Sequence, residues 1–208
     1  MTEGTFDFAL FFAAFVALLA LVNPIQKIFL MTSLKGQLTD KELSILAYKS
    51  TFAAFLILLL FLSLGNVIFN YIFHIQLYAF RITCGLVLVF NGFDSLQKGI
   101  MIRMEKGIKV RDVSAVPVAM PMIAGPGAIT AAVTFPNQYG LLVTISALML
   151  ALLVNYCCMY FAGFAGKILA RLNLMSALVR ILGLIIATIG VQMISTGLIE
   201  LLQEAGVI

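Results

Sequence analysis

Charged residues are scarce in this chain of 208 residues, where Asp, Glu, Lys and Arg together make up 11%. Hydrophobic residues make up 62%, and the mean hydropathy is +1.12. A soluble domain of this size does not need so much apolar residue, and it does not confine its charges to short stretches. The composition therefore excludes a soluble globular protein and predicts an integral membrane protein in contact with the lipid bilayer.

Long polar linkers and a basic leader are also missing. Without a linker that could separate two domains, we expect a single membrane domain over residues 1–208. Glu3 and Asp7 make the N-terminus acidic, whereas a cleaved signal peptide begins with basic residues. The net charge of +4 is assigned to cytoplasmic loops, so no nucleic-acid partner is expected.

Histidine and cysteine are too few for most catalytic and metal sites. His74 is the one histidine, and the three cysteines, Cys84, Cys157 and Cys158, all fall in apolar segments. This placement fits buried thiols rather than disulfides, and no further ligand supports a metal at the adjacent pair. We therefore expect no enzyme, no metal and no cofactor. Because this chain also lacks a nucleotide-binding P-loop, H⁺ or Na⁺ coupling would fit a transport role.

Six continuously apolar segments remain, and they lack the alternation of a β-barrel, so membrane-spanning helices are predicted. They cover residues of about 8–34, 46–68, 77–96, 113–135, 141–164 and 177–201. Lys and Arg gather in the first, third and fifth connections, while both termini are acidic. The positive-inside rule then places both termini outside the cell inner (cytoplasmic) membrane.

Two of these segments contain helix breakers near their middle. The first carries Asn23-Pro24, and the fourth carries Pro121 and Gly125-Pro126-Gly127. Residues 8–22 make only about 22 Å of helix, against the roughly 30 Å of a hydrocarbon core. Each interruption should therefore lie at membrane depth, where irregular backbone is tolerated only against protein or a water-filled cavity.

Each interruption exposes backbone groups that suit a zwitterion. The N–H groups of Gly127, Ala128 and Ile129 could hold a carboxylate. The carbonyls of Ile123 and Ala124 could hold an ammonium group, and Asn23 and Gln26 offer amides from the first segment. The predicted substrate site comprises Asn23, Pro24, Gln26, Ile123, Ala124, Gly125, Pro126, Gly127 and Ala128. The alternative is a pair of kinks that only shape the bundle.

Polar residues elsewhere in the apolar segments are candidates for coupling or gating. They are Lys27, Asn91, Asp94 and Gln192. Intramembrane ionisable residues are functional by default. The alternative for Lys27 is that its long side chain snorkels inward, and the alternative for Asp94 is a solvated helix end near the cytoplasmic side. Small-residue faces at Ala162–Gly166 and Gly183–Ala187 predict close helix packing and leave a homo-oligomer open.

The two interruptions recur within an internal repeat. Asn23-Pro24-Ile25 matches Gly125-Pro126-Gly127, and Arg81-Ile-Thr-Cys84 matches Arg180-Ile-Leu-Gly183. Repeat one covers about 1–100 and repeat two about 110–208. Because each repeat has three helices, the copies are inverted in the membrane. The predicted fold is all-α, with six transmembrane helices in two inverted three-helix repeats and with the first and fourth helices broken.

Asn23-Pro24, the run from Pro117 to Thr130 and the paired Arg-Ile openings resemble the MarC family of inner-membrane proteins. That family includes SnatA-like transporters of glycine, alanine and other neutral amino acids, so the resemblance implies substrate binding at the broken helices. Gln26 stands where the family usually has glycine. The predicted function is secondary transport of small neutral amino acids by alternating access. The alternative is a non-transport multi-pass protein with a structural or stress-related role.

Overall fold

The computed structural model describes residues 7–35, 38–72, 74–98, 123–171 and 175–207, and all regular structure in these ranges is helical. Five helices there are long and apolar enough to cross a membrane. They cover Phe8–Leu34, Asp40–Gly65, Leu77–Gln97, Leu141–Tyr160 and Ser176–Glu204. The prediction of an all-α multi-pass membrane protein is confirmed.

The described residues form a series of helices along the chain. They are α1 (Phe8–Val22), α2 (Pro24–Leu34), α3 (Asp40–Val67), the π-helical turn η1 (Ile68–Ile72), α4 (Leu77–Lys98), α6 (Pro126–Tyr139), α7 (Leu141–Tyr160), α8 (Ala162–Arg171) and α9 (Met175–Glu204).

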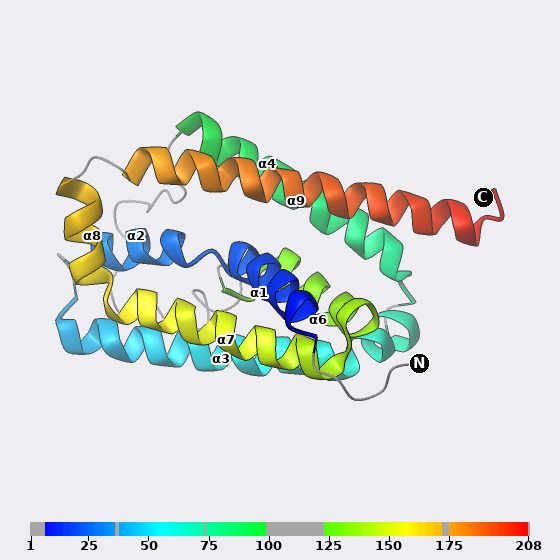
Figure 1. Cartoon of the computed structure of the whole chain (residues 1–208), viewed down its shortest axis with the longest axis horizontal. Helices are drawn as coiled ribbons and strands as arrows, with labels where there is room; N and C mark the ends of the chain where they lie inside the picture. Colours follow the sequence, from blue (N-terminus) through cyan, green and yellow to red (C-terminus); the bar gives the residue numbers. More distant parts are fainter. Residues whose placement is uncertain (1–6, 36–37, 73, 99–122, 172–174, 208) are drawn as a thin grey trace.

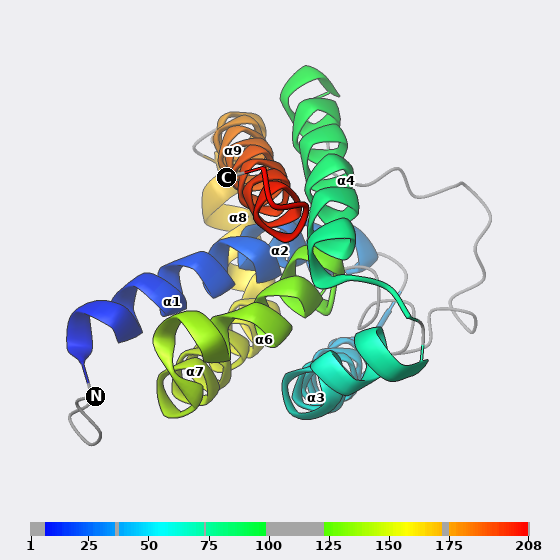
Figure 2. The same ribbon diagram turned by 90° about the vertical axis from the view of Figure 1, so that its right-hand side faces the viewer.

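Short helices are held between two pairs of long ones. α4 and α9 lie side by side along one edge, and α3 and α7 lie along the other (Figure 1). Viewed end-on, α1, α2 and α6 fill the layer between these two pairs (Figure 2). The first interruption and the start of α6 therefore lie in this middle layer.

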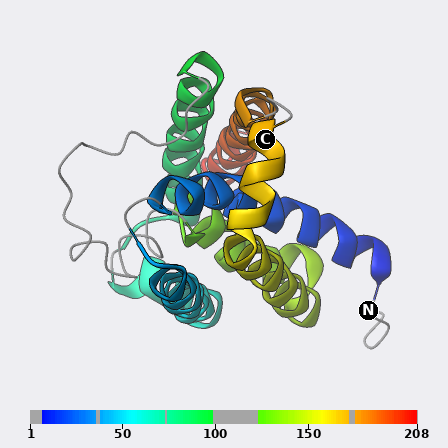
Figure 3. The ribbon, with the colours of Figure 1, turned by 90° about the vertical axis from the view of Figure 1, so that its left-hand side faces the viewer.

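Two predicted segments differ from the structure at their ends, and a third is only partly described. α3 begins at Asp40 rather than near 46, because Thr39 and Glu42 form a capping box that starts the helix before its apolar part. The fifth segment does not continue to 164. α7 ends at Tyr160, and α8 turns away from it towards α9 (Figure 3). The first half of the fourth segment, including Pro121, lies outside the described residues.

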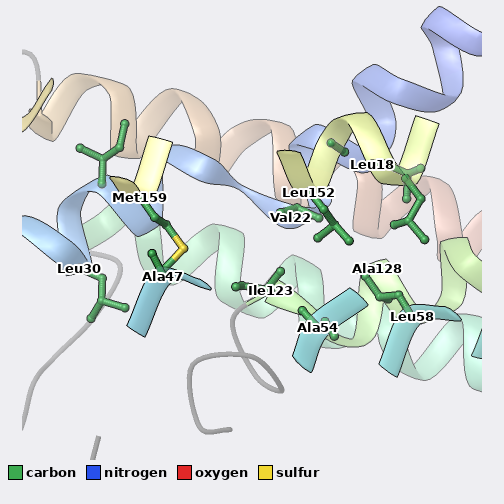
Figure 4. Close-up of a cluster of buried hydrophobic side chains, with 14 of the residues drawn as sticks. Leu18, Val22, Leu30, Ala47, Ala54, Leu58, Ile123, Ala128, Leu152 and Met159 are labelled. Atoms are coloured by element: carbon green, nitrogen blue, oxygen red, sulfur yellow. The ribbon is translucent and has the colours of Figure 1, made fainter. Parts of the chain in front are cut away.

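The core joins the central layer to α3 and α7. Leu18 and Val22 of α1 are fully buried together with Leu58 of α3 and Leu152 of α7 (Figure 4). Large apolar side chains such as Phe12, Phe90 and Leu142 are 64%, 73% and 79% exposed. Apolar surface on this scale requires a lipid environment rather than water.

Glycines bring the backbones of α4 and α9 into direct contact. A Cβ at Gly85 would lie 2.7 Å from the Gly190 carbonyl oxygen, and one at Gly92 would lie 2.5 Å from that of Gly183. Numbers rise along α4 while their partners fall along α9, so the two helices are antiparallel. Only glycine permits this approach, because any side chain would collide with backbone.

Candidate functional site

The first interruption is formed by a single residue that caps two helices. Asn23 has φ 53° and ψ 71°, a left-handed conformation that asparagine tolerates better than most residues. Its N–H donates to the Leu19 carbonyl at 2.9 Å and ends α1. Its side-chain oxygen accepts from the Gln26 N–H at 3.3 Å and starts α2. Pro24 occupies the first helical position of α2, where its missing N–H costs nothing.

Lys27 provides a hydrogen-bond donor to the backbone at the end of α1. Its side chain is fully buried, and the ammonium group donates to the carbonyl oxygen of Val22, the last residue of α1. A cation there complements the negative end of the α1 dipole. The Lys27 amine is therefore directed into the protein, where it is engaged at the interruption.

At the second interruption, the α6 N-terminus has no side-chain cap from the described residues. α6 begins at Pro126 with Gly125 as its N-cap, and no side chain of the described residues caps this end. The Ile129 N–H donates to the Gly125 carbonyl at 3.0 Å, so the first hydrogen bond of the helix occupies it. The amides of Gly127 and Ala128 remain as the helix N-terminal donors for an anion, because Pro126 has no N–H.

Both interruptions meet at one small cavity of about 180 Å³, which we call the small cavity. Polar residues of α4 complete it. Its lining consists of Leu21, Asn23, Gln26, Leu88, Asn91, Asp94, Ser95, Gly125, Pro126, Gly127 and Ile186. It is smaller than the roughly 300–1,000 Å³ of pockets for drug-sized ligands. The chain thus places two helix interruptions, two amides of the first break and one carboxylate around a space for a small polar molecule.

Comparison with known proteins identifies the family. The model of the MarC family of integral membrane proteins matches residues 8–202. The chain belongs to the MarC family. A UPF0056 membrane protein of Pyrococcus horikoshii is 35% identical to this chain over 180 residues, which cover 86% of this chain and 89% of the relative.

Two further relatives extend the likeness to bacteria. A UPF0056 membrane protein from Buchnera aphidicola of Schizaphis graminum is 33% identical, over 95% of this chain and 96% of its own length. One from Aquifex aeolicus is 28% identical, over 94% of this chain and 95% of its own length. No solved structure matches the chain. The names of these MarC-family relatives state membrane location and no activity.

Seven residues that the sequence singles out in this MarC-family chain line the small cavity. They are Asn23, Gln26, Asn91, Asp94, Gly125, Pro126 and Gly127. Asp94 therefore borders the same space as the interruptions rather than only a solvated helix end. Gln26 also borders this space.

Other predicted residues lie elsewhere. The side chains of Ile123, Ala124 and Ala128 are buried in the hydrophobic core and do not line the small cavity. Pro24 shapes the interruption without lining the cavity. Gln192 lines a second, larger cavity of about 760 Å³, the large cavity, between α1, α4, α6 and α9.

Four lining residues have no sequence signal of their own: Leu21, Leu88, Ser95 and Ile186. The three apolar ones resemble every other apolar residue of a membrane helix. Ser95 donates to the Asn91 carbonyl at 2.8 Å, as serine commonly does inside a helix. In the part of the chain that the structure describes, no group of three or more His, Cys, Asp or Glu could hold a metal ion.

Proposed function

We propose that this protein is a secondary transporter of small neutral amino acids of the glycine and alanine type. The observation that carries the proposal is the small cavity, where both helix interruptions meet three polar side chains of α4. Discontinuous helices of this kind bind substrates near the bilayer midplane in several transporter folds. A volume of about 180 Å³ favours a small solute.

The chemistry of the small cavity complements a zwitterion. The amide of Gly127, at the positive end of the α6 dipole, suits the carboxylate. The Asp94 carboxylate suits the ammonium group, with the Asn23, Gln26 and Asn91 amides around it. Asp94 replaces the Ile123 and Ala124 carbonyls of the sequence-based hypothesis, since those residues belong to the core.

Packing between helices supports two inverted repeats. α2 packs on α7 while α6 packs on α3, and α4 packs antiparallel on α9. A two-fold axis in the membrane plane that exchanges α2 with α6, the helices that follow the two interruptions, would also exchange these pairs. Under this axis, the glycine contacts make Gly85 the counterpart of Gly183. This register differs by one residue from the one in which Arg81 is the counterpart of Arg180. Rocking of one repeat against the other would expose the small cavity to each side in turn.

The remaining assignments follow from this function. We place the protein in the cytoplasmic membrane with both termini outside, as the distribution of Lys and Arg favours. We expect a proton or sodium gradient to drive transport. Asp94 is the acidic residue in the lining of the small cavity, so we expect its carboxylate to bind the coupling ion.

Uptake of labelled glycine and alanine into proteoliposomes tests the proposal. We expect uptake driven by a proton or sodium gradient, and we expect Asp94→Asn to reduce it about tenfold or more through loss of a charge-assisted contact. Thr83→Val is the matched control, because Thr83 is exposed on the same helix and lines neither cavity. Absence of uptake by the unsubstituted protein would favour the structural role instead. Full uptake by Asp94→Asn would remove the site assignment.

A further inference from the structure

The large cavity and the small cavity are neighbours that share part of their lining. Leu21 of α1 and Gly127 of α6 border both. The large cavity extends from there past Arg81 and Gln138 to Glu200, near the end of α9. It therefore lies towards the end of the molecule where α4 begins and α9 ends (Figure 1).

Apolar side chains separate the two cavities. A Cβ at Gly127 would lie 2.7 Å from Leu21 Cδ2 and 2.9 Å from Leu88 Cδ1. The tips of these two leucines therefore meet over the backbone of Gly127. Since they are the ends of flexible side chains, we expect a change of their rotamers to widen this neck.

Beyond the neck, the large cavity carries opposite charges. Arg81 of α4 and Glu200 of α9 form an ion pair in its lining, with side chains 13% and 36% exposed. Hydroxyl and amide groups of Thr130, Thr134 and Gln192 lie in the same lining. Charges within membrane helices are costly and mark solute pathways more often than structural contacts.

We propose that the large cavity is a second solute-binding site, which holds the zwitterion on the far side of the leucine neck from the small cavity. The substrate carboxylate binds the Arg81 guanidinium, and its ammonium group binds the Glu200 carboxylate. The choice of a zwitterion rests on the proposed function. With about 760 Å³, this site admits larger side chains than the small cavity does, so selection by size occurs at the neck.

A thiol-protection experiment on the full chain in detergent tests this site. Cys84, Cys157 and Cys158 are replaced by alanine, and Gln192→Cys supplies a thiol in the large cavity. We expect glycine to slow its modification by a charged methanethiosulfonate. Arg81→Gln should raise the glycine concentration for half-protection about tenfold, as expected for loss of one charge-assisted contact.

Two further variants keep the result interpretable. Arg180→Gln is the matched control, because Arg180 is exposed on α9 and lines neither cavity, so it should leave protection unchanged. The double variant Arg81→Gln with Glu200→Gln removes both charges together. Arg81→Gln alone leaves the Glu200 carboxylate without its ion-pair partner. The double variant should lose protection even if that single variant fails to fold.

Asn91→Leu separates this proposal from the proposed function. The added apolar volume fills the small cavity, so uptake should be lost while glycine still protects the Gln192→Cys thiol. Loss of protection in Asn91→Leu, or absence of protection in a protein that takes up glycine, overturns the second site and leaves transport standing. Protection without uptake in the otherwise unsubstituted protein supports the second site and overturns transport.

Discussion

At the residue scale, the first interruption depends on the conformational tolerance and hydrogen-bonding capacity of Asn23. Pro24 disfavours helical backbone in the residue before it, and asparagine adopts the left-handed conformation with little penalty. The same side chain then provides an acceptor for the next helix. Lys27 completes the arrangement by donating to the Val22 carbonyl. The carbonyls of Leu19 and Val22 at the end of α1 are thus hydrogen-bonded within the protein, as polar backbone at membrane depth requires.

Substitutions at Asn23 separate these two contributions. Asn23→Gly keeps the left-handed backbone and loses the side-chain cap, which costs roughly a few tenths of a kcal/mol. Asn23→Ala loses the cap and also adopts an unfavourable backbone, at a further cost of about 1 kcal/mol. We expect Asn23→Ala to unfold at a lower temperature than Asn23→Gly, by circular dichroism in detergent. Equal stabilities of the two variants would show that the observed φ is not maintained in the protein.

At the element scale, helix length separates scaffold from site. α3 and α9 have 28 and 30 residues and exceed the membrane thickness, whereas α1 and α6 have 15 and 14 and cannot cross it. The short helices are therefore held by the long ones, and their ends meet inside the protein. The antiparallel contact of α4 with α9 sets how closely the surrounding helices approach.

Glycine substitutions test that contact. A Cβ at Gly92 would lie 2.5 Å from the Gly183 carbonyl oxygen and 2.6 Å from the Ala187 nitrogen. Backbone cannot yield as a side chain does, so we expect Gly92→Ala to destabilise the protein by about 1–3 kcal/mol. Gly163→Ala is the matched control, because its nearest neighbour is the flexible end of Lys35. Thermal unfolding of both variants in detergent measures the difference. Equal unfolding temperatures would contradict the close packing of α4 on α9.

At the scale of the whole molecule, function depends on which cavity faces which side of the membrane. The large cavity opens towards the ends of α6 and α9, and the small cavity borders the later half of α4. In the proposed orientation, which places both termini outside, a solute from outside would reach the large cavity first and cross the leucine neck to the small one.

Cysteine labelling in intact cells tests this orientation. In a background without native cysteines, Asn137→Cys at the end of α6 should react with a membrane-impermeant thiol reagent. Lys41→Cys at the start of α3 should react only after the membrane is permeabilised, since the first connection is rich in lysine. Both positions are exposed, so accessibility in the fold does not limit either reaction. The reverse pattern would place both termini in the cytoplasm.

The spanning helices and the helix interruptions could be predicted from the local sequence. Apolar runs predicted the spanning helices, because lipid leaves the backbone no partner except itself. Asn23-Pro24 and Gly125-Pro126 predicted the interruptions, because proline and its neighbours restrict the backbone wherever they occur. The same residues identified most of the polar lining of the small cavity.

Contacts between segments that are distant in the sequence could not be predicted from the sequence in the same way. The end of α7 at Tyr160, the engagement of Lys27 with Val22 and the leucine neck over Gly127 all depend on how the helices pack. Leu21 and Leu88 carry no local sign of their position, since a leucine facing lipid and one facing a cavity are chemically identical. Backbone preference depends on residues that are neighbours in the sequence, so the sequence predicts it directly. A cavity forms only when helices from distant parts of the chain pack together, so only the tertiary structure determines it.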